Sequence, residues 1–217
     1  MDPIRVFIVD DHRIFLEGLV RLIQDHASMK IVGTGADGRE ALKQIQALRP
    51  DVVLMDISMP NLNGVEATRL ISQNNPNTKV VILTMHENEE FLRRTLEAGA
   101  MGYLLKDSTA DELFIAIKEA HRGNAYLSPP LSRKLISNYL GISKGEQVNP
   151  VDLSLSGRER EILQLLAEGH SNKAISKCLN LSLKTVETHR KNIMKKLNLH
   201  RITDLVRYAI RSGIIES

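Results

Sequence analysis

The sequence predicts an α/β domain with a doubly wound parallel sheet, followed by a smaller all-α domain, in a chain of 217 residues. Apolar, strand-like runs alternate with segments of helical spacing in residues 1–122, which is the pattern of a parallel sheet covered on both faces. Residues 153–217 show helical spacing alone. The charge balance also changes: 14 Lys and Arg against 18 Asp and Glu up to Ala125, then 15 against 8 from Tyr126 onward. An acidic first part and a basic second part indicate two modules with different partners.

Five strands are predicted in the first domain. The runs VVLM and VVIL are almost continuously apolar, as expected of strands that are buried on both faces. We place the strands at residues 5–9, 29–34, 51–55, 79–84 and 101–105. The helices that follow them carry apolar residues three or four positions apart, within 14–23, 41–48, 65–71, 91–96 and 113–120.

Residues 123–152 differ in composition and are predicted to be a linker that contains one short helix, LSRKLISNYL. Gly123 and the pair Pro129-Pro130 open this segment, and GISKGEQVNPVD adds two glycines and a proline. A long functional loop inside a single domain is the alternative, but loops of this length are uncommon. The predicted domains are therefore 1–122 and 153–217.

Four helices are predicted in the second domain. Ser156 with Glu159 three positions later is the pattern of a capping box, and the helix that it opens ends at Gly169. The other three helices are predicted at 172–179, 183–199 and about 202–212.

The composition limits where the protein works. Cys178 is the only cysteine, so a disulfide within the chain is impossible. No stretch is apolar for long enough to span a bilayer, and the N-terminus lacks the pattern of a signal peptide. We therefore expect a cytoplasmic protein without a membrane partner.

Polar side chains gather at the ends of the predicted strands. Asp10 and Asp11 follow the first strand and Asp56 follows the third, while Thr84 ends the fourth and Lys106 follows the fifth. Ligands of a doubly wound sheet bind beyond the carboxyl ends of its strands, so we expect these side chains to form one site. A simpler interpretation of the first pair is that one aspartate caps the next helix and the other is solvated.

The residue types at this edge indicate a particular chemistry. Three carboxylates in one pocket repel each other unless a cation lies among them, and oxygen ligands completed by water suit Mg²⁺. A carboxylate is also a nucleophile toward phosphorus and can form an aspartyl phosphate. The ammonium and hydroxyl groups would then hold the phosphoryl oxygens, because positioning and charge neutralisation dominate phosphoryl transfer.

Residues 3–122 resemble the receiver domain of two-component response regulators, whose fold is CheY-like (flavodoxin-like) with the strand order 2-1-3-4-5. The resemblance rests on VDDH at 9–12, MDISMPNLNG at 55–64, LTMH at 83–86 and YLLKD at 103–107. It implies that Asp56 is the phospho-acceptor and that Lys106 binds the phosphoryl group. It also implies a Mg²⁺ ion held by Asp10, Asp11, Asp56 and the backbone carbonyl of Ser58.

The same resemblance assigns further roles near the site. Thr84 and Tyr103 would be the pair that switches on phosphorylation, although core packing alone is an alternative for Tyr103. His86, together with Ser58, would tune hydrolysis of the acyl phosphate, with a plain exposed loop residue as the alternative for His86. Asp107 departs from the pattern, since many receivers have proline after the lysine, and this leaves the geometry of the bond between Lys106 and Asp107 open.

The second domain carries a basic stretch. Between Ser171 and Arg201 there are eight Lys or Arg residues and one acidic residue, Glu187. Because this charge coincides with a helix-turn-helix pattern, it indicates nucleic-acid binding rather than a solvated face alone. In the helix VETHRKNIMKKL, one face holds the apolar residues Val186, Ile193 and Leu197, with Met194 nearby. The opposite face is predicted to enter a major groove.

The candidate DNA-binding residues lie in the two helices of this pattern. They are Ser171, Asn172, Lys173, Lys184, Thr185, Glu187, Thr188, Arg190, Lys191 and Lys195. We assign Lys184, Thr185, Arg190 and Lys195 to phosphates, and Glu187, Thr188 and Lys191 to base edges.

Residues 153–217 resemble the LuxR-type helix-turn-helix domain, through the stretches LLAEGHSNK, LSLKTVETHR and IMKKL. Two positions depart from the pattern. Gly157 stands where proline is common, which predicts a looser helix start, and Ala174-Ile175-Ser176 replaces the usual Glu-Ile-Ala. The last helix carries Leu205, Val206, Ala209 and Ile210, part of which we interpret as a dimer contact, with core packing as the alternative.

The two resemblances together imply a response regulator of the NarL/FixJ type, which is a phosphorylation-controlled, DNA-binding transcriptional regulator. It would not be an enzyme in its own right, although a receiver assists its own phosphorylation and dephosphorylation with Mg²⁺. The expected partners are a sensor histidine kinase, double-stranded promoter DNA and, once the protein is phosphorylated, a second copy in a homodimer. RNA polymerase is a further candidate.

Two other classes of protein share some of these features. A phosphatase of the haloacid dehalogenase type also forms an aspartyl phosphate, but it needs a second aspartate where this chain has Ser58, and it needs a cap insertion. A small-ligand sensor of the quorum-sensing type would have a ligand-binding domain in place of the aspartate site.

Overall fold

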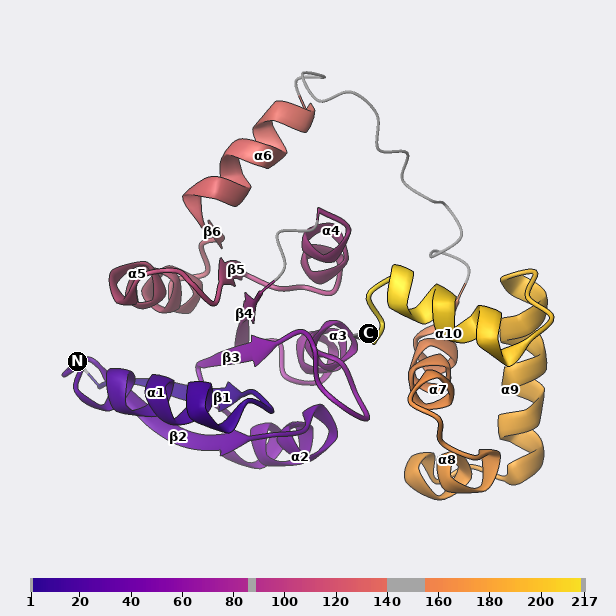
Figure 1. Cartoon of the computed structure of the whole chain (residues 1–217). Helices are drawn as coiled ribbons and strands as arrows, with labels where there is room; N and C mark the ends of the chain where they lie inside the picture. The colour runs from indigo at the N-terminus through magenta and orange to yellow at the C-terminus, as the bar shows by residue number, and fades with distance from the viewer. Residues whose placement is uncertain (1, 86–88, 140–154, 216–217) are drawn as a thin grey trace. The chain divides into compact units, whose positions relative to one another are not determined.

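The computed structural model describes residues 2–85, 89–139 and 155–215. The chain forms two compact units, of which the first holds the helices and strands from Ile4 to Tyr139 and the second holds the helices from Gly157 to Arg211 (Figure 1). The predicted boundary of the second domain at residue 153 lies outside the described residues, as does the whole of GISKGEQVNPVD at 141–152.

A parallel sheet forms the centre of the first unit. In the described residues its order is β2-β1-β3-β4-β5-β6, so the predicted order of the first five strands is confirmed. The strands are β1 (Ile4–Val9), β2 (Met29–Gly35), β3 (Val52–Asp56), β4 (Lys79–Thr84), β5 (Gly102–Leu105) and β6 (Tyr126–Leu127). From β1 the chain continues to β2 on one side of the sheet, and from β3 it continues to β4 on the other side. The carboxyl ends of β1 and β3 therefore lie side by side at the point where the strand order reverses.

The strand β6 was not predicted, because its residues were assigned to the linker. It pairs in parallel with β5 through Gly102 and Tyr126. Two residues are too few to show an alternating pattern, so only the contact with β5 defines this strand. The sheet therefore continues into the segment 123–152, and α6 (Pro129–Tyr139) is the short helix expected there. Leu131 of this helix is buried.

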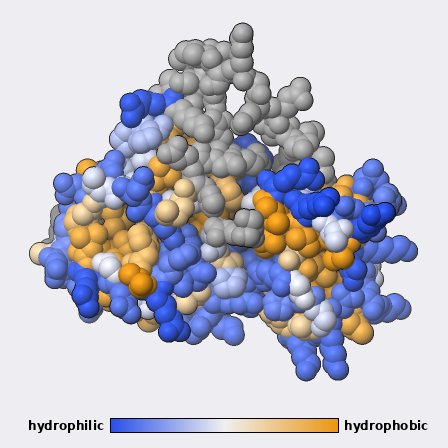
Figure 2. All heavy atoms as spheres, in the orientation of Figure 1, coloured by the Kyte–Doolittle hydropathy of each residue, from blue (hydrophilic) through white to orange (hydrophobic). Residues whose placement is uncertain are grey.

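Two layers of helices cover the sheet (Figure 1). On one face, α1 (Arg13–Gln24) and α5 (Ala110–His121) share a core cluster with side chains of β1, β3, β4 and β5. On the other face, α2 (Gly38–Leu48), α3 (Gly64–Asn74) and α4 (Glu89–Glu97) pack in a row. Apolar side chains also gather at the surface over α1 and α5 (Figure 2).

The second unit contains α7 (Gly157–Ala167), α8 (Asn172–Leu179), α9 (Leu183–Lys196) and α10 (Ile202–Arg211). The central helix α7 contacts the other three around one apolar cluster. The predicted capping box is confirmed, since Ser156 Oγ accepts from Glu159 N–H and the Glu159 carboxylate accepts from Ser156 N–H. The helix begins at Gly157 with both bonds in place, so the structure shows no loosened start.

Each helix in the described ranges is either too short or too polar to span a membrane.

Candidate functional site

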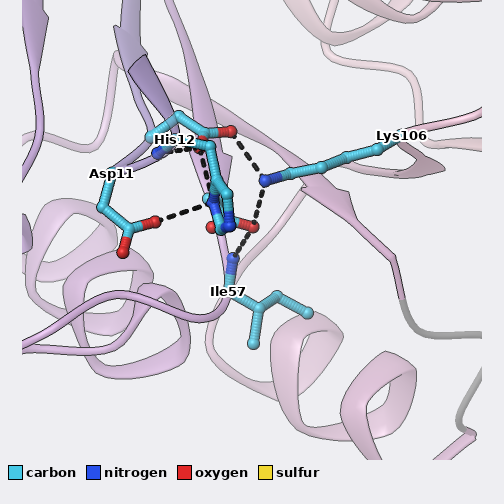
Figure 3. Close-up of polar contacts among 6 residues, drawn as sticks. Asp11, His12, Ile57 and Lys106 are labelled. Carbon is cyan, nitrogen blue, oxygen red and sulfur yellow. Dashed lines mark hydrogen bonds and ion pairs between the residues drawn. The ribbon is translucent and has the colours of Figure 1, made fainter. Parts of the chain in front are cut away.

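An acidic cluster lies where β1 and β3 end, and one lysine joins its two buried members. Asp10 follows β1 and is 1% exposed, while Asp56 is the last residue of β3 and is 3% exposed. Lys106, which follows β5, places its Nζ 2.8 Å from Asp10 Oδ2 and 3.2 Å from Asp56 Oδ1 (Figure 3). Three of the predicted site residues thus meet at one sheet edge, because parallel strands deliver their carboxyl ends together.

Hydrogen bonds hold both buried carboxylates in place. The backbone N–H of Ile57 donates to Asp56 Oδ1 at 2.9 Å, and that of His12 donates to Asp10 Oδ1 at 2.9 Å. Because Asp10 is buried and bonded to Lys106, the interpretation of this pair as one cap and one solvated group is wrong for Asp10. The first helix begins after His12, whose side chain makes no capping hydrogen bond.

Sequence reasoning missed the contribution of His12. Its Nδ1 lies 3.0 Å from Asp11 Oδ1 and 3.3 Å from Asp10 Oδ1, while most of its side chain is exposed (Figure 3). The only available signal was its position directly after the two aspartates, which says nothing about the direction of the ring. The imidazole therefore belongs to the rim of the acidic cluster.

Burial changes the acidity of the central carboxyl group. It raises the pKa of Asp56 from 3.8 to about 7, against the opposing effect of the Lys106 ammonium and with the help of the Asp10 and Asp11 charges. Ionised Asp56 is therefore costly in this site unless a further cation compensates it.

The donor set fits a hard divalent cation. Ligand atoms of Asp10, Asp11, His12 and Asp56 all lie within 4.8 Å of one another. Asp56 Oδ2 is buried and has no hydrogen-bond partner among the described residues, so one oxygen at the centre of the cluster remains available. Carboxylate oxygens suit Mg²⁺. Ser58, two residues beyond Asp56, is half-buried.

The predicted switch pair is buried in this structure. Thr84 at the end of β4 is 1% exposed, and Tyr103 in β5 is fully buried. A side-chain hydrogen bond joins the two residues, and burial raises the pKa of the Tyr103 phenol. Tyr103 therefore packs in the core and also contacts Thr84. The next residue, Met85, is exposed, whereas His86 lies outside the described residues.

The replacement of proline by Asp107 leaves the lysine in place. Every peptide bond in the described residues is trans, including the one between Lys106 and Asp107. The Lys106 Nζ lies 4.9 Å from the centre of the Phe15 ring, which supports it from the side of α1.

In the second unit, α8 and α9 form the predicted helix-turn-helix. Asn180, in the left-handed conformation with φ of 53°, ends α8, and the Ser182 side chain caps α9 by accepting from Thr185 N–H. The apolar face of α9 is buried as predicted, at Val186, Ile193 and Leu197. The residues Lys184, Glu187, Thr188, Lys191 and Lys195 are exposed together, while Thr185 and Arg190 are half-buried.

Local hydrogen bonds restrict two of the hydroxyl groups assigned to DNA. The Thr188 hydroxyl donates to the Lys184 carbonyl at 2.9 Å, so its proton is already used within the helix. Ser171 caps α8 by accepting from Ala174 N–H. Beside Ser171, Asn172 is half-buried and Lys173 is exposed at the start of α8.

Two family descriptions match this chain in succession. Residues 6–118 match the response regulator receiver domain, and residues 153–209 match the luxR family of bacterial regulatory proteins. The chain belongs to the two-component response regulators with a LuxR-type DNA-binding domain. It is thus a phosphorylation-dependent transcriptional regulator.

Known relatives span the whole response regulator. The transcriptional regulatory protein DegU of Brevibacillus brevis is 38% identical over 228 aligned residues, which cover 99% of this chain and 96% of DegU. The oxygen regulatory protein NreC of Staphylococcus epidermidis is 39% identical, with 98% of this chain and 99% of NreC covered.

Solved structures agree with this assignment. The Salmonella typhimurium response regulator RcsB matches with a TM-score of 0.65 and 27% identity over 98% of this chain and 99% of RcsB. A LuxR-family response regulator from Aurantimonas matches with a TM-score of 0.62 and 35% identity over 64% of this chain and 99% of that chain.

The structure narrows the part of α10 that could form the predicted dimer contact in the response regulator. Leu205 and Ala209 of α10 are fully buried in the core of their own unit, so neither is available to a partner. Val206 is half-buried and Ile210 is 38% exposed. The helical pattern could not separate these pairs, because adjacent apolar positions on one helix can serve either a core or an interface.

Proposed function

We propose that a sensor histidine kinase transfers a phosphoryl group to Asp56, and that this modification controls binding of the second unit to promoter DNA. The main support for this proposal is the position of the Lys106 ammonium, which pairs with both Asp10 and Asp56 at the edge of the sheet. Asp56 Oδ2 has no hydrogen-bond partner in the described chain. This arrangement presents one oxygen of a fixed carboxylate and a cation beside it, as phosphoryl acceptance requires.

The chemistry follows from the positions of these groups. Asp56 Oδ2 attacks phosphorus, the new P–O bond forms as the P–N bond to the kinase histidine breaks, and the imidazole leaves with that electron pair. The Ile57 N–H and Lys106 hold Asp56 Oδ1, which fixes the direction of the other oxygen. Lys106 and the Thr84 hydroxyl would then contact the transferred phosphoryl oxygens.

Mg²⁺ completes the proposal for the acidic cluster. Asp10, Asp11, Asp56 and the backbone carbonyl of Ser58 would hold it, and it would supply the positive charge that three carboxylates and a phosphoryl group need. His12, at 3.0 Å from Asp11, would orient that carboxylate from the rim.

Phosphorylation by acetyl phosphate tests the acceptor. Wild type should gain one phosphoryl group in the presence of Mg²⁺, as seen by phosphate-affinity gel electrophoresis, whereas Asp56→Asn should gain none. Asp107→Asn is the matched control, because Asp107 is an exposed carboxylate next to Lys106. Equal labelling of Asp56→Asn and wild type, or labelling that EDTA does not reduce, would disprove the assignment.

We also propose that the exposed face of α9 reads DNA, with the start of α8 on the phosphates. The residues concerned are Ser171, Asn172, Lys173, Lys184, Thr185, Glu187, Thr188, Arg190, Lys191 and Lys195. RcsB has been solved in complex with DNA. In that structure RcsB is 28% identical to this chain, with a TM-score of 0.59 over 95% of this chain and 98% of RcsB. The support from this chain is the exposed, basic surface of α9 opposite its buried face.

Lys191→Ala distinguishes a base contact from a phosphate contact. If Lys191 reads a base, the variant should lose about 1–3 kcal/mol at one base pair of the operator and little elsewhere. A phosphate contact would instead weaken binding to all sequences and reduce its salt dependence. Titration against single-base operator variants measures this, with Arg207→Ala on α10 as the control. Unchanged affinity on every sequence would contradict the assigned face.

The modules and further partners form the last part of the proposal. We assign residues 1–122 to the receiver, 123–152 to a connecting segment that begins with β6 and α6, and 153–217 to the DNA-binding domain. Phosphorylation would favour a homodimer on two-fold symmetric DNA, and RNA polymerase is the candidate target at the promoter.

A further inference from the structure

Lys106, which joins the two buried carboxylates, is itself almost buried. Its side chain is 6% exposed, and its backbone is fixed because the Lys106 N–H donates to the Thr84 carbonyl at 2.7 Å. The Nζ forms ion pairs with Asp10 and Asp56. A lysine side chain is long and flexible, so holding it in one conformation costs entropy. Any further contact that restricts the side chain therefore helps to place the ammonium.

The face of an aromatic ring supplies such a contact. The Lys106 Nζ lies over the Phe15 ring, 4.9 Å from its centroid, and a cation–π interaction extends to about 6 Å. The interaction is stronger where water is excluded, as it is around a lysine this deeply buried. Phe15 belongs to α1, whereas the two carboxylates lie at the ends of β1 and β3, so the ring adds a contact from a third element.

The core of the receiver holds the ring in turn. Phe15 is half-buried and packs against the core cluster that α1 shares with the sheet, and Leu19 of that cluster follows one helical turn later on the same face. Phe15 also lies in the first turn of α1, shortly after Asp10 and Asp11. An aliphatic side chain would contribute to this core as well, but it would not attract an ammonium.

A neutral ring suits this position better than a further carboxylate would. A carboxylate would attract the ammonium, but it would also add negative charge to a cluster that already contains Asp10, Asp11 and Asp56, and it would be a metal ligand itself. The ring attracts the ammonium through its quadrupole alone. Its contact with Lys106 therefore does not compete with the binding of a cation by the carboxylates.

We propose that Phe15 is a positioning residue for phosphoryl transfer, because its ring holds the Lys106 ammonium beside the oxygen that accepts the phosphoryl group. Without the ring, the ammonium would spend part of its time elsewhere, and the transition state would lose part of the charge stabilisation that Lys106 gives. The effect on transfer rests on the proposed role of Asp56, whereas the contact between the ring and the ammonium does not.

A double-mutant cycle without Mg²⁺ measures the contact by itself. The four full-length proteins are wild type, Phe15→Leu, Lys106→Met and the double variant, and urea denaturation is followed through the amide signals of β1 and β3. Loss of the ring should lower the folding equilibrium constant at least about threefold more when Lys106 is present than when methionine replaces it. An equal loss in both backgrounds would overturn the proposal, because the ring would then contribute packing only.

The rate of labelling by acetyl phosphate with Mg²⁺ measures the effect on transfer. Phe15→Leu should be labelled at least about threefold more slowly than wild type, and Phe15→Tyr, which keeps the aromatic face, should recover most of the lost rate. Leu16→Ala is the matched control, because Leu16 is the next residue of α1 and packs against the same core cluster. It should lose folding stability without a comparable loss of labelling rate.

Three results of the labelling experiment would overturn the positioning role: an undiminished rate in Phe15→Leu, no recovery in Phe15→Tyr, or equal slowing in Phe15→Leu and Leu16→Ala. If Lys106→Met does not fold, these rates decide on the proposal without the cycle. Absence of labelling in every protein, wild type included, would instead refute the proposed acceptor, and the cycle would still decide whether the ring holds the ammonium.

Discussion

The acidic site buries carboxyl groups whose negative charge favours the binding of a cation. Three carboxylates lie close together, the Lys106 ammonium pairs with Asp10 and Asp56, and the buried Asp56 keeps an unpartnered oxygen in the described chain. A metal ion bound here would offset a cost, the burial of negative charge, that the folded protein already bears.

Asp56 should make the stability of the protein depend on pH. Its pKa in the folded state, about 7, exceeds the ordinary 3.8, so the folded state is favoured at low pH and loses stability as the pH rises from about 4 through 7. Asp56→Asn should remove this loss. Without Mg²⁺ the variant should be more stable than wild type at pH 8, by an amount on the order of 2 kcal/mol, and equally stable at pH 4.

Chemical denaturation at both pH values measures this difference. Mg²⁺ should reduce the difference in unfolding free energy between Asp56→Asn and wild type at pH 8, because it binds the folded wild type, whose Asp56 carboxylate is intact. If Asp56→Asn were less stable than wild type at pH 8, burial would not be the dominant influence on this carboxyl group.

The hydrogen bond between Tyr103 and Thr84 should link phosphorylation to DNA binding. Tyr103→Phe keeps the ring volume and removes the hydroxyl, with an expected loss of about 1 kcal/mol of folding free energy. Labelling by acetyl phosphate should persist, while the increase in DNA affinity on phosphorylation should shrink. Because the pair is already buried here, a large inward movement of Tyr103 is not required for this effect. A full affinity response in Tyr103→Phe would exclude the switch role.

At the scale of elements, one buried glutamate connects two helices of the DNA-binding unit. Glu159 caps α7 and also accepts from the Lys196 Nζ at 2.7 Å, at the end of α9. Burial raises the pKa of Glu159, but the hydrogen bonds from Lys196 and Ser156 outweigh this and lower it overall. This contact ties the end of α9 to the start of α7.

Lys196→Met should therefore weaken the unit in a pH-dependent way. A carboxyl group with a lowered pKa contributes stability above its unfolded value, near 4.5, and loses it as the pH falls. The variant should lose about 1 kcal/mol at pH 7, and the loss should become smaller below pH 4. Thermal unfolding of the full chain at the two pH values measures it, with the exposed Lys195→Met as the control. Equal losses of unfolding free energy in Lys196→Met and Lys195→Met would show that the ion pair between Glu159 and Lys196 does not stabilise the unit.

At the scale of the whole molecule, phosphorylation must change an equilibrium. A shift from 1:99 to 99:1 in favour of a dimer takes about 5.5 kcal/mol of differential stabilisation. Beryllofluoride, which mimics the phosphoryl group, should raise the mass seen by light scattering and the DNA affinity together.

The exposed part of α10 should contribute to that dimer. Ile210→Glu should reduce the beryllofluoride-induced dimer without unfolding the unit, because Ile210 is 38% exposed. Glu at the buried Leu205 would instead unfold it, so Ile210 is the informative position. Constant mass and constant DNA affinity in wild type with beryllofluoride would contradict the proposal, and an unaffected dimer in Ile210→Glu would remove α10 from the interface.

Local patterns in the sequence determined much of this protein. The five longer strands, the capping box at Ser156 and the buried face of α9 follow from periodicity and capping chemistry, which act over a few residues. The sheet edge shared by Asp10, Asp56 and Lys106 also follows, because parallel strands of a doubly wound sheet place their carboxyl ends together.

Tertiary structure alone decided the remaining features. Strand β6 exists only through its pairing with β5, and Leu205 belongs to a core rather than to an interface only because α7 covers it. The direction of the His12 ring and the raised pKa of Asp56 depend on groups far apart in the sequence or on burial in the assembled fold. Each of these is a non-local property: a side chain's surroundings are set by the elements packed on it, and its own sequence neighbours do not specify them.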